Sequence, residues 1–196
     1  MSAPGVGAVL VGGAGRRMGG VAKGLLPAPS GEPIALALTR AFEAIGWEPV
    51  LVGDAVAYAA LGLRAVADEP AGVGPIGGLC AALGYAGERC VIVVGCDMPF
   101  VDAATLAALA AHPSRAPALA PREADRWEPL LSRWDAARCV AAVRAEIARG
   151  TRSLQRACDA VGAERWPMEL AARRALVDWD EPGDLARARP DPLRSP

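Results

Sequence analysis

The stretch Leu10-Val11-Gly12-Gly13-Ala14-Gly15-Arg16-Arg17-Met18-Gly19-Gly20-Val21-Ala22-Lys23-Gly24-Leu25-Leu26 begins at the end of an apolar run, residues 6–11, and continues as a glycine-rich segment. The apolar run predicts a strand, and the segment after it predicts a loop. Five glycines in that loop, at positions 12, 13, 15, 19 and 20, allow positive φ and a close approach to a ligand, so that successive backbone N–H groups can face an anion. The loop also carries three cations, Arg16, Arg17 and Lys23. A strand followed by such a loop indicates a polyphosphate-binding site.

The glycine spacing excludes the two commonest phosphate loops. A Walker loop requires Gly-Lys followed by Ser or Thr, whereas here two residues separate Gly20 from Lys23, and Gly24 stands at the hydroxyl position. The dinucleotide fingerprint requires a third glycine at the position where this chain has Met18. The alternative to phosphate binding is a glycine-rich surface turn with solvated arginines.

The composition narrows the class of protein. The chain has 196 residues, 53% of them hydrophobic, which is enough to bury the core of one domain. The net charge of -1 argues against a nucleic-acid binder, which normally has a basic excess. No run reaches the roughly 18 apolar residues of a membrane span, and the first residues lack the basic region of a secretory signal. We therefore expect a cytoplasmic protein with neither a nucleic acid nor a membrane as partner.

Cysteine and histidine usage excludes several kinds of site. The five cysteines form no CxxC pair and are odd in number, which favours reduced thiols over a disulfide framework or a zinc site. His112 is the only histidine, and it stands beside Pro113 and Ser114. We expect it to be an ordinary surface residue. A multi-histidine metal site is thereby excluded, as is a histidine triad unless His112 itself carries it.

Strand-like and helix-like segments alternate along the first half of the chain. We expect strands at residues 6–11, 49–52, 63–67 and 90–94, helices at 34–45, 55–61 and 76–85, and a loop at 68–78. Residues 90–94 are continuously apolar and mostly β-branched, as is typical of a strand buried on both faces. The alternation predicts an α/β fold with a doubly wound, mostly parallel sheet and helices on both faces.

Ligands of such sheets bind outside the carboxyl ends of the strands. Three segments with chemically useful side chains follow predicted strands: residues 12–23, residues 68–78, which begin with Asp68, and Gly95-Cys96-Asp97-Met98-Pro99. We expect them to converge in one crevice.

Asp97 is the most informative single residue. It follows directly on the predicted central strand, and Pro99 forces the chain to change direction. Mg²⁺ usually binds one or two protein carboxylates together with substrate phosphate oxygens and water, so one Asp beside a phosphate loop predicts a magnesium ligand. The alternative is an N-cap for the helix that follows, but Asp102 fits that position better.

Four motifs in this order resemble the molybdenum cofactor guanylyltransferases, which are nucleotidyltransferases with a Rossmann-like fold. The resemblance covers residues 6–188. The motifs are Leu10-Val11-Gly12-Gly13 with Arg17-Met18-Gly19 and Lys23; Gly74-Pro75-Ile76-Gly77-Gly78; Cys96-Asp97-Met98-Pro99; and Val177-Asp178-Trp179-Asp180-Glu181-Pro182-Gly183-Asp184-Leu185.

The resemblance implies transfer of GMP from GTP to the terminal phosphate of molybdopterin, with release of pyrophosphate and with Mg²⁺ as cofactor. It implies that Leu10, Val11, Gly12 and Gly13 hold the nucleotide and that Asp68 lies at the nucleoside. Arg17 and Lys23 would neutralise the phosphates. Asp97 would bind the metal and act in catalysis, and Asp180 would be a second metal ligand. It also implies molybdoenzyme maturation proteins as further partners.

The resemblance also guides the second half of the chain. Residues 127–134, with Trp127 and Trp134, are expected to form a strand that borders the acceptor pocket, and core packing is the alternative for both tryptophans. The apolar spacing predicts helices at 136–149 and 154–161, and Arg152 between them is a candidate contact for an anionic acceptor. The single domain spans residues 1–196, of which 187–196 are expected to be a frayed tail.

The chain departs from the family pattern in ways that keep other functions open. Ala22 precedes Lys23 where the family usually has Asp, and Asp178 and Asp180 replace asparagines. One alternative is a related nucleotidyltransferase that uses CTP or another phosphorylated acceptor, although Val11-Gly12-Gly13 favours GTP. The other alternative is a GTP-binding partner protein with impaired catalysis.

Overall fold

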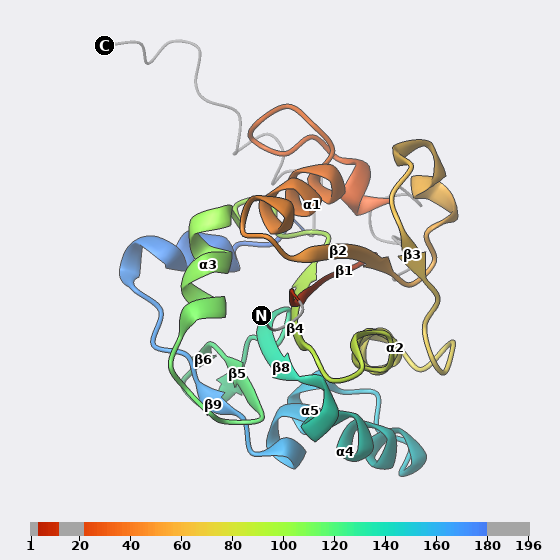
Figure 1. The fold of residues 1–196 in the computed structure, drawn as a ribbon, viewed down its shortest axis with the longest axis vertical. Helices are drawn as coiled ribbons and strands as arrows, with labels where there is room; N and C mark the ends of the chain where they lie inside the picture. The colour runs from red at the N-terminus through yellow and green to blue at the C-terminus, as the bar shows by residue number, and fades with distance from the viewer. Residues whose placement is uncertain (1–3, 12–21, 180–196) are drawn as a thin grey trace.

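The computed structural model describes residues 4–11 and 22–179. These residues form a seven-stranded sheet in the order β3-β2-β1-β4-β8-β5-β9, together with a separate hairpin of β6 and β7 (Figure 1). The strands of the large sheet are β1 (Val6–Leu10), β2 (Glu48–Val52), β3 (Ala65–Val66), β4 (Cys90–Gly95), β5 (Ala118–Ala120), β8 (Leu131–Asp135) and β9 (Glu164–Arg165).

The first four strands are parallel, as predicted. β1 pairs with β2 on one side and with β4 on the other, and β3 pairs with β2. All the residues of β1 are buried, and so are all those of β4 after Cys90. Strands covered on both faces have this continuous apolar sequence. The expected mostly parallel α/β sheet is confirmed.

The other half of the sheet contains a reversed strand. β8 runs antiparallel to both β4 and β5, while β5 and β9 are parallel to each other. The expected single strand over residues 127–134 was wrong, because Trp127 ends the hairpin strand β7 (Arg126–Trp127), whose partner is β6 (Arg122–Glu123), and β8 begins only at Leu131. Pro129 lies in the break, where its missing N–H cannot join a ladder.

Helices cover both faces of the sheet (Figure 1). One face packs against α1 (Ile34–Ala44) and α3 (Ala103–Ala111). The other packs against α2 (Pro75–Ala86), α4 (Ala136–Ala148) and α5 (Leu154–Val161). Successive strand residues alternate between the two apolar cores: Val91 and Val93 belong to one, Ile92 and Val94 to the other.

Two local expectations need correction. Residues 68–78 do not form a loop throughout, because α2 begins at Pro75, a residue favoured in the first turn of a helix. Residues 55–61 form the 3₁₀ helix η3 (Val56–Leu61) rather than an α-helix. Two further 3₁₀ helices are η2 (Lys23–Leu25) and η4 (Leu170–Leu176).

A glycine in β1 sets the distance between the sheet and α1. A Cβ atom on Gly7 would lie 2.2 Å from the ring of Phe42 in α1, so only glycine lets the helix approach this closely. Within the described residues, no helix is long and apolar enough to span a membrane.

Candidate active site

The carboxyl ends of the parallel strands form one continuous edge. The N–H of Val11 donates to the Val52 carbonyl at 2.9 Å, and the N–H of Cys96 donates to the Leu10 carbonyl at 3.1 Å. The residues just beyond β1 and β4 therefore donate to the last residues of the neighbouring strands, so the hydrogen bonding continues past the strand ends. Asp68, Asp97 and Lys23 all lie at or next to this edge, and the contact between Lys23 and Asp97 joins two of the three segments that were predicted to converge.

Asp97 and Lys23 meet although they are far apart in the sequence. Lys23 Nζ lies 3.3 Å from Asp97 Oδ2, and the two side chains are about one-fifth exposed. The carboxylate folds over the end of β4, where a Cβ atom on Gly95 would lie only 2.6 Å from Asp97 Oδ1. Glycine at this position therefore makes the space that the carboxylate occupies.

The second carboxylate oxygen, Asp97 Oδ1, is buried and has no hydrogen-bond partner among the described residues. A buried, unpartnered acceptor costs free energy, which a bound cation would recover. In the described ranges, no group of three or more His, Cys, Asp or Glu side chains is placed to hold a metal ion. The donor set thus fits a hard cation that takes most of its ligands from phosphate oxygens and water.

Residues 174–179, the last part of the chain that the structure describes, pack around Asp97 and Phe100. The N–H of Trp179 donates to the Asp97 carbonyl at 2.9 Å, and the Trp179 ring meets the Phe100 ring edge-on at 6.0 Å. The guanidinium of Arg174 stacks over the other aromatic ring of this group, Phe100, at 4.2 Å. Sequence reasoning missed this contact, and its only signal was the aromatic residue between Asp178 and Asp180.

Asp68 lies beside the first turn of α2. A Cβ atom on Gly78 would lie 3.1 Å from Asp68 Oδ1 and 3.2 Å from the Leu10 side chain, so Asp68 and Leu10 flank the same glycine. Burial, and secondarily the charge of Asp54, raises the pKa of the Asp68 carboxyl above its ordinary value. The structure thus brings two of the residues assigned to the nucleotide, Leu10 and Asp68, close together.

The predicted nucleotide residues Leu10 and Val11 have buried side chains, each 6% exposed, and they pack in opposite cores. Any contact that they make with a nucleotide must therefore come from the backbone. Gly12, Gly13, Arg17 and Asp180, together with the tail at 187–196, lie outside the described residues.

Ala22 is half-buried and packs against the apolar core on the α1 side of the sheet. Because its side chain is a methyl group, it supplies no charge at the position where the resembled family usually has a carboxylate. Arg152 is exposed, and its carbonyl lies 3.8 Å from where a Cβ atom on Gly74 would be, at the start of α2. The loop between α4 and α5 thus borders the same end of that helix.

The remaining sequence expectations concern structural residues. Asp102 caps α3 by accepting the N–H of Thr105 at 2.8 Å, as predicted. Trp127 and Trp134 are 4% and 1% exposed, which confirms core packing for both.

His112 is half-buried, follows the last residue of α3 and accepts the N–H of Ser114 through Nδ1. All five cysteines are free thiols, and burial, followed by the charge of Asp97, raises the pKa of the Cys96 thiol to about 11.

Comparison with known proteins is consistent with this geometry. The family model for the MobA-like NTP transferase domain matches residues 7–161. A protein of Opitutus terrae named probable molybdenum cofactor guanylyltransferase is 33% identical over 193 residues, covering 93% of this chain and 94% of its own. The molybdenum cofactor guanylyltransferase of Pseudomonas syringae pv. syringae is 34% identical over 156 residues, covering 77% of each chain.

A solved structure supports the same relationship. The crystal structure of molybdopterin-guanine dinucleotide biosynthesis protein A from Archaeoglobus fulgidus superposes with a TM-score of 0.77 at 27% sequence identity. The superposition covers 93% of this chain and 96% of the other.

Proposed function

This chain belongs to the family of MobA-like NTP transferase domains, and from that premise we propose that it transfers GMP from GTP to the terminal phosphate of molybdopterin. The observation that carries the proposal is the pair of Lys23 and Asp97 at the carboxyl edge of the sheet, with Asp97 Oδ1 buried and unpartnered in the described part of the chain. An ammonium group and an available carboxylate oxygen are the groups needed to hold a metal-bound triphosphate.

The chemistry asks for positioning rather than for a protein nucleophile. An oxygen of the acceptor phosphate forms a bond to the α-phosphorus of GTP, and the bond from that phosphorus to the bridging oxygen breaks, so that pyrophosphate leaves. Such transfers depend mainly on alignment and on neutralisation of charge. Lys23 would balance negative charge on the phosphates, and backbone N–H groups after β1 would add hydrogen bonds.

Asp97 would hold a divalent cation, for which we propose Mg²⁺, and Asp180 is proposed as a second ligand. When bound, such an ion neutralises charge on the phosphate oxygens. Arg17 is proposed to share that task with Lys23. Leu10, Val11, Gly12 and Gly13 would bind the nucleotide through the backbone, with Asp68 at the nucleoside.

The acceptor is proposed to bind near Arg152, whose carbonyl borders the start of α2 and whose positive charge suits an anionic acceptor. A cytoplasmic location and contacts with molybdoenzyme maturation proteins stay predictions.

The test is to measure pyrophosphate release from GTP in the presence of Mg²⁺ and purified molybdopterin, with CTP and ATP as controls. Release with GTP alone, together with formation of the guanine dinucleotide product, is the expected result. Release with CTP instead would replace the nucleotide assignment. GTP binding by calorimetry without any release of pyrophosphate would favour a GTP-binding partner protein with impaired catalysis. Ala22, which stands where the family usually has Asp, is the residue that suggests this alternative.

A further inference from the structure

A buried tyrosine contacts one chain neighbour of Lys23 and one chain neighbour of Asp97. Tyr58, in η3, is 3% exposed. Its hydroxyl accepts the N–H of Gly24, the residue after Lys23, at 3.2 Å. The same hydroxyl lies 4.0 Å from Sγ of Cys96, the residue before Asp97. One side chain thus joins the turn that carries the cation to the strand end that carries the carboxylate.

Close packing strengthens this connection. A Cβ atom on Gly24 would lie 2.8 Å from a ring carbon of Tyr58 and 3.2 Å from the Cβ atom of Ala35. Gly24 is buried, so the 3₁₀ turn η2 rests directly on the phenol ring and on α1. Any larger residue would push the turn, and Lys23 with it, away from β4.

The phenol contributes hydrogen bonds without charge. Burial, followed by the neighbouring Cys96 thiol, raises the pKa of Tyr58 well above its ordinary value, so the hydroxyl keeps its proton at neutral pH. A neutral hydroxyl can accept from Gly24 and donate toward Cys96 at the same time. It therefore adds no negative charge beside a site for phosphates.

We propose that Tyr58 is a positioning residue, whose hydroxyl holds the Lys23 turn against the strand end that carries Asp97 so that both side chains reach one nucleotide. The inference rests on the proposed function, since it concerns how that site is held in place. Tyr58 touches neither Lys23 nor Asp97 through its hydroxyl, and it acts through their neighbours Gly24 and Cys96.

The test compares Tyr58→Phe with Tyr85→Phe, which removes a phenol hydroxyl at the opposite end of the sheet. Tyr85 donates to Glu48 and accepts from Arg64. Tyr58→Phe is expected to lower kcat about tenfold and to weaken GTP binding several-fold, as expected for one lost positioning hydrogen bond. Tyr85→Phe is expected to leave both quantities unchanged. Thermal unfolding of each variant is measured alongside.

A double-mutant cycle separates positioning from general loosening of the fold. In a Lys23→Ala background, Tyr58→Phe is expected to cause no further loss of kcat or GTP affinity, because the group that it positions is absent. A loss of the same size in both backgrounds would overturn the proposal, and so would wild-type kinetics for Tyr58→Phe. If that variant does not fold, Gly24→Ala decides: it is expected to give the same loss, and wild-type kinetics for it would contradict the positioning role.

GTP binding and GMP transfer by the wild-type protein separate failure of the proposed function from failure of the positioning role of Tyr58. If it binds GTP but transfers no GMP, the proposed function fails, and the cycle measured on GTP affinity still decides the role of Tyr58. If it neither binds nor transfers, both are overturned. If it transfers GMP while Tyr58→Phe matches Tyr85→Phe, only the role of Tyr58 is overturned.

Discussion

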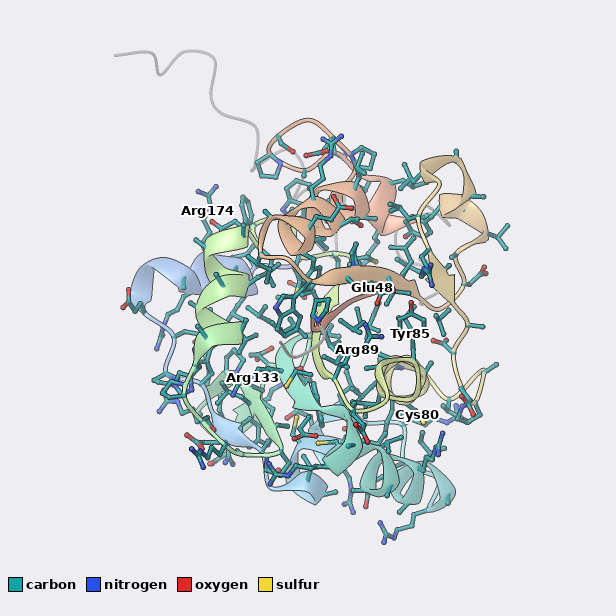
Figure 2. The ribbon with its side chains drawn as sticks, viewed as in Figure 1. Glu48, Cys80, Tyr85, Arg89, Arg133 and Arg174 are labelled. Carbon is teal, nitrogen blue, oxygen red and sulfur yellow. The ribbon has the colours of Figure 1, made fainter. Side chains whose placement is uncertain are left out.

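The two ends of the parallel strands treat their charged groups in opposite ways. At the amino end, Glu48 of β2 accepts hydrogen bonds from Arg89 Nη1 at 2.5 Å and from the hydroxyl of Tyr85 (Figure 2). Arg64 Nη1 lies 3.9 Å from Glu48 Oε1. At the carboxyl end, Asp97 Oδ1 has no hydrogen-bond partner in the residues that the structure describes. The two ends belong to the same strands but differ in how fully their polar atoms are satisfied.

The pKa values of the carboxyl groups at the two ends are shifted in opposite directions. The hydrogen bond from Arg89, and then that from Tyr85, lowers the pKa of Glu48 below its ordinary value. Burial raises the pKa of Asp68 at the other end. A lowered carboxyl pKa means that the folded state favours the charge, whereas a raised one means that the folded state opposes it. The ionised Glu48 at the amino end thus stabilises the folded state. At the carboxyl end the folded state opposes the charge of Asp68, and a bound cation would favour that charge.

The comparison is tested most strongly by Asp97→Ala. We expect turnover to fall about 10³-fold, because the carboxylate that would hold the cation is lost. The free energy of unfolding should change by less than about 1 kcal/mol, since the variant also removes a buried oxygen that has no partner among the described residues. Steady-state pyrophosphate release and urea unfolding measure the two effects. Asp102→Ala is the control: it should lose about 1 kcal/mol of stability with its N-cap and keep its turnover.

Lys23→Ala should have the next largest effect. Loss of a charge-assisted phosphate contact is expected to weaken GTP binding by roughly 1.5 to 3 kcal/mol, or about 10- to 150-fold. Isothermal titration with GTP and Mg²⁺ measures it. Arg40→Ala removes an equal charge from the surface pair with Glu32 and should leave the affinity unchanged. Equal affinities for both variants would show that the loop has been misinterpreted.

At the amino end, Glu48→Gln should destabilise the protein without changing GTP binding. The expected loss at pH 7 is about 0.5 to 1 kcal/mol, because the cluster is partly screened by solvent. Since the folded-state pKa is lowered, the stabilisation is present above the unfolded-state value and is lost as the pH falls through the folded-state pKa. The gap between wild type and variant in urea unfolding should therefore close in acid. A gap that persists at low pH would assign it to packing instead.

Asp68→Asn should produce the smallest effect, and one of opposite sign. Because burial raises the folded-state pKa, the ionised carboxyl costs stability, and the variant should gain about 0.5 kcal/mol at pH 7. The gain should disappear below the unfolded-state pKa, where both states of the wild type are protonated. Urea unfolding over a pH series measures it, and GTP affinity should drop if Asp68 contacts the nucleoside. A loss of stability at pH 7 would contradict the contrast between the two ends.

The sequence predicted the parallel half of the sheet well for a physical reason. Residues 6–11 and 91–94 are buried on both faces, and such strands have continuous apolar sequences that can be recognised without knowing their partners. The same reasoning placed Asp97 and Lys23 at one edge, because parallel strands end together. The contact between the two side chains depends on the path of the chain after each strand, and so does the lack of a partner for Asp97 Oδ1 within the described ranges.

The other half of the sheet was harder to predict because its strands are short. β5 has three residues and β9 has two, too few to show a period of their own. They exist because β8 and its neighbours offer backbone groups to pair with. Tyr58 was missed for a similar reason: one phenol in an alanine-rich segment reveals its role only through Gly24 and Cys96, which approach it from distant parts of the chain.

The hydrogen bond from Trp179 to the Asp97 carbonyl has a consequence for synthesis on the ribosome. Strands β1, β2 and β4 can assemble soon after they emerge, but β5 must wait for β8 to pair with it, and Asp97 must wait for Trp179. Contacts between distant segments form late when a chain is made vectorially. A nascent chain that stops before this tryptophan would therefore contain the core strands without the completed edge, and nucleotide retention would mark chains whose translation has passed that point.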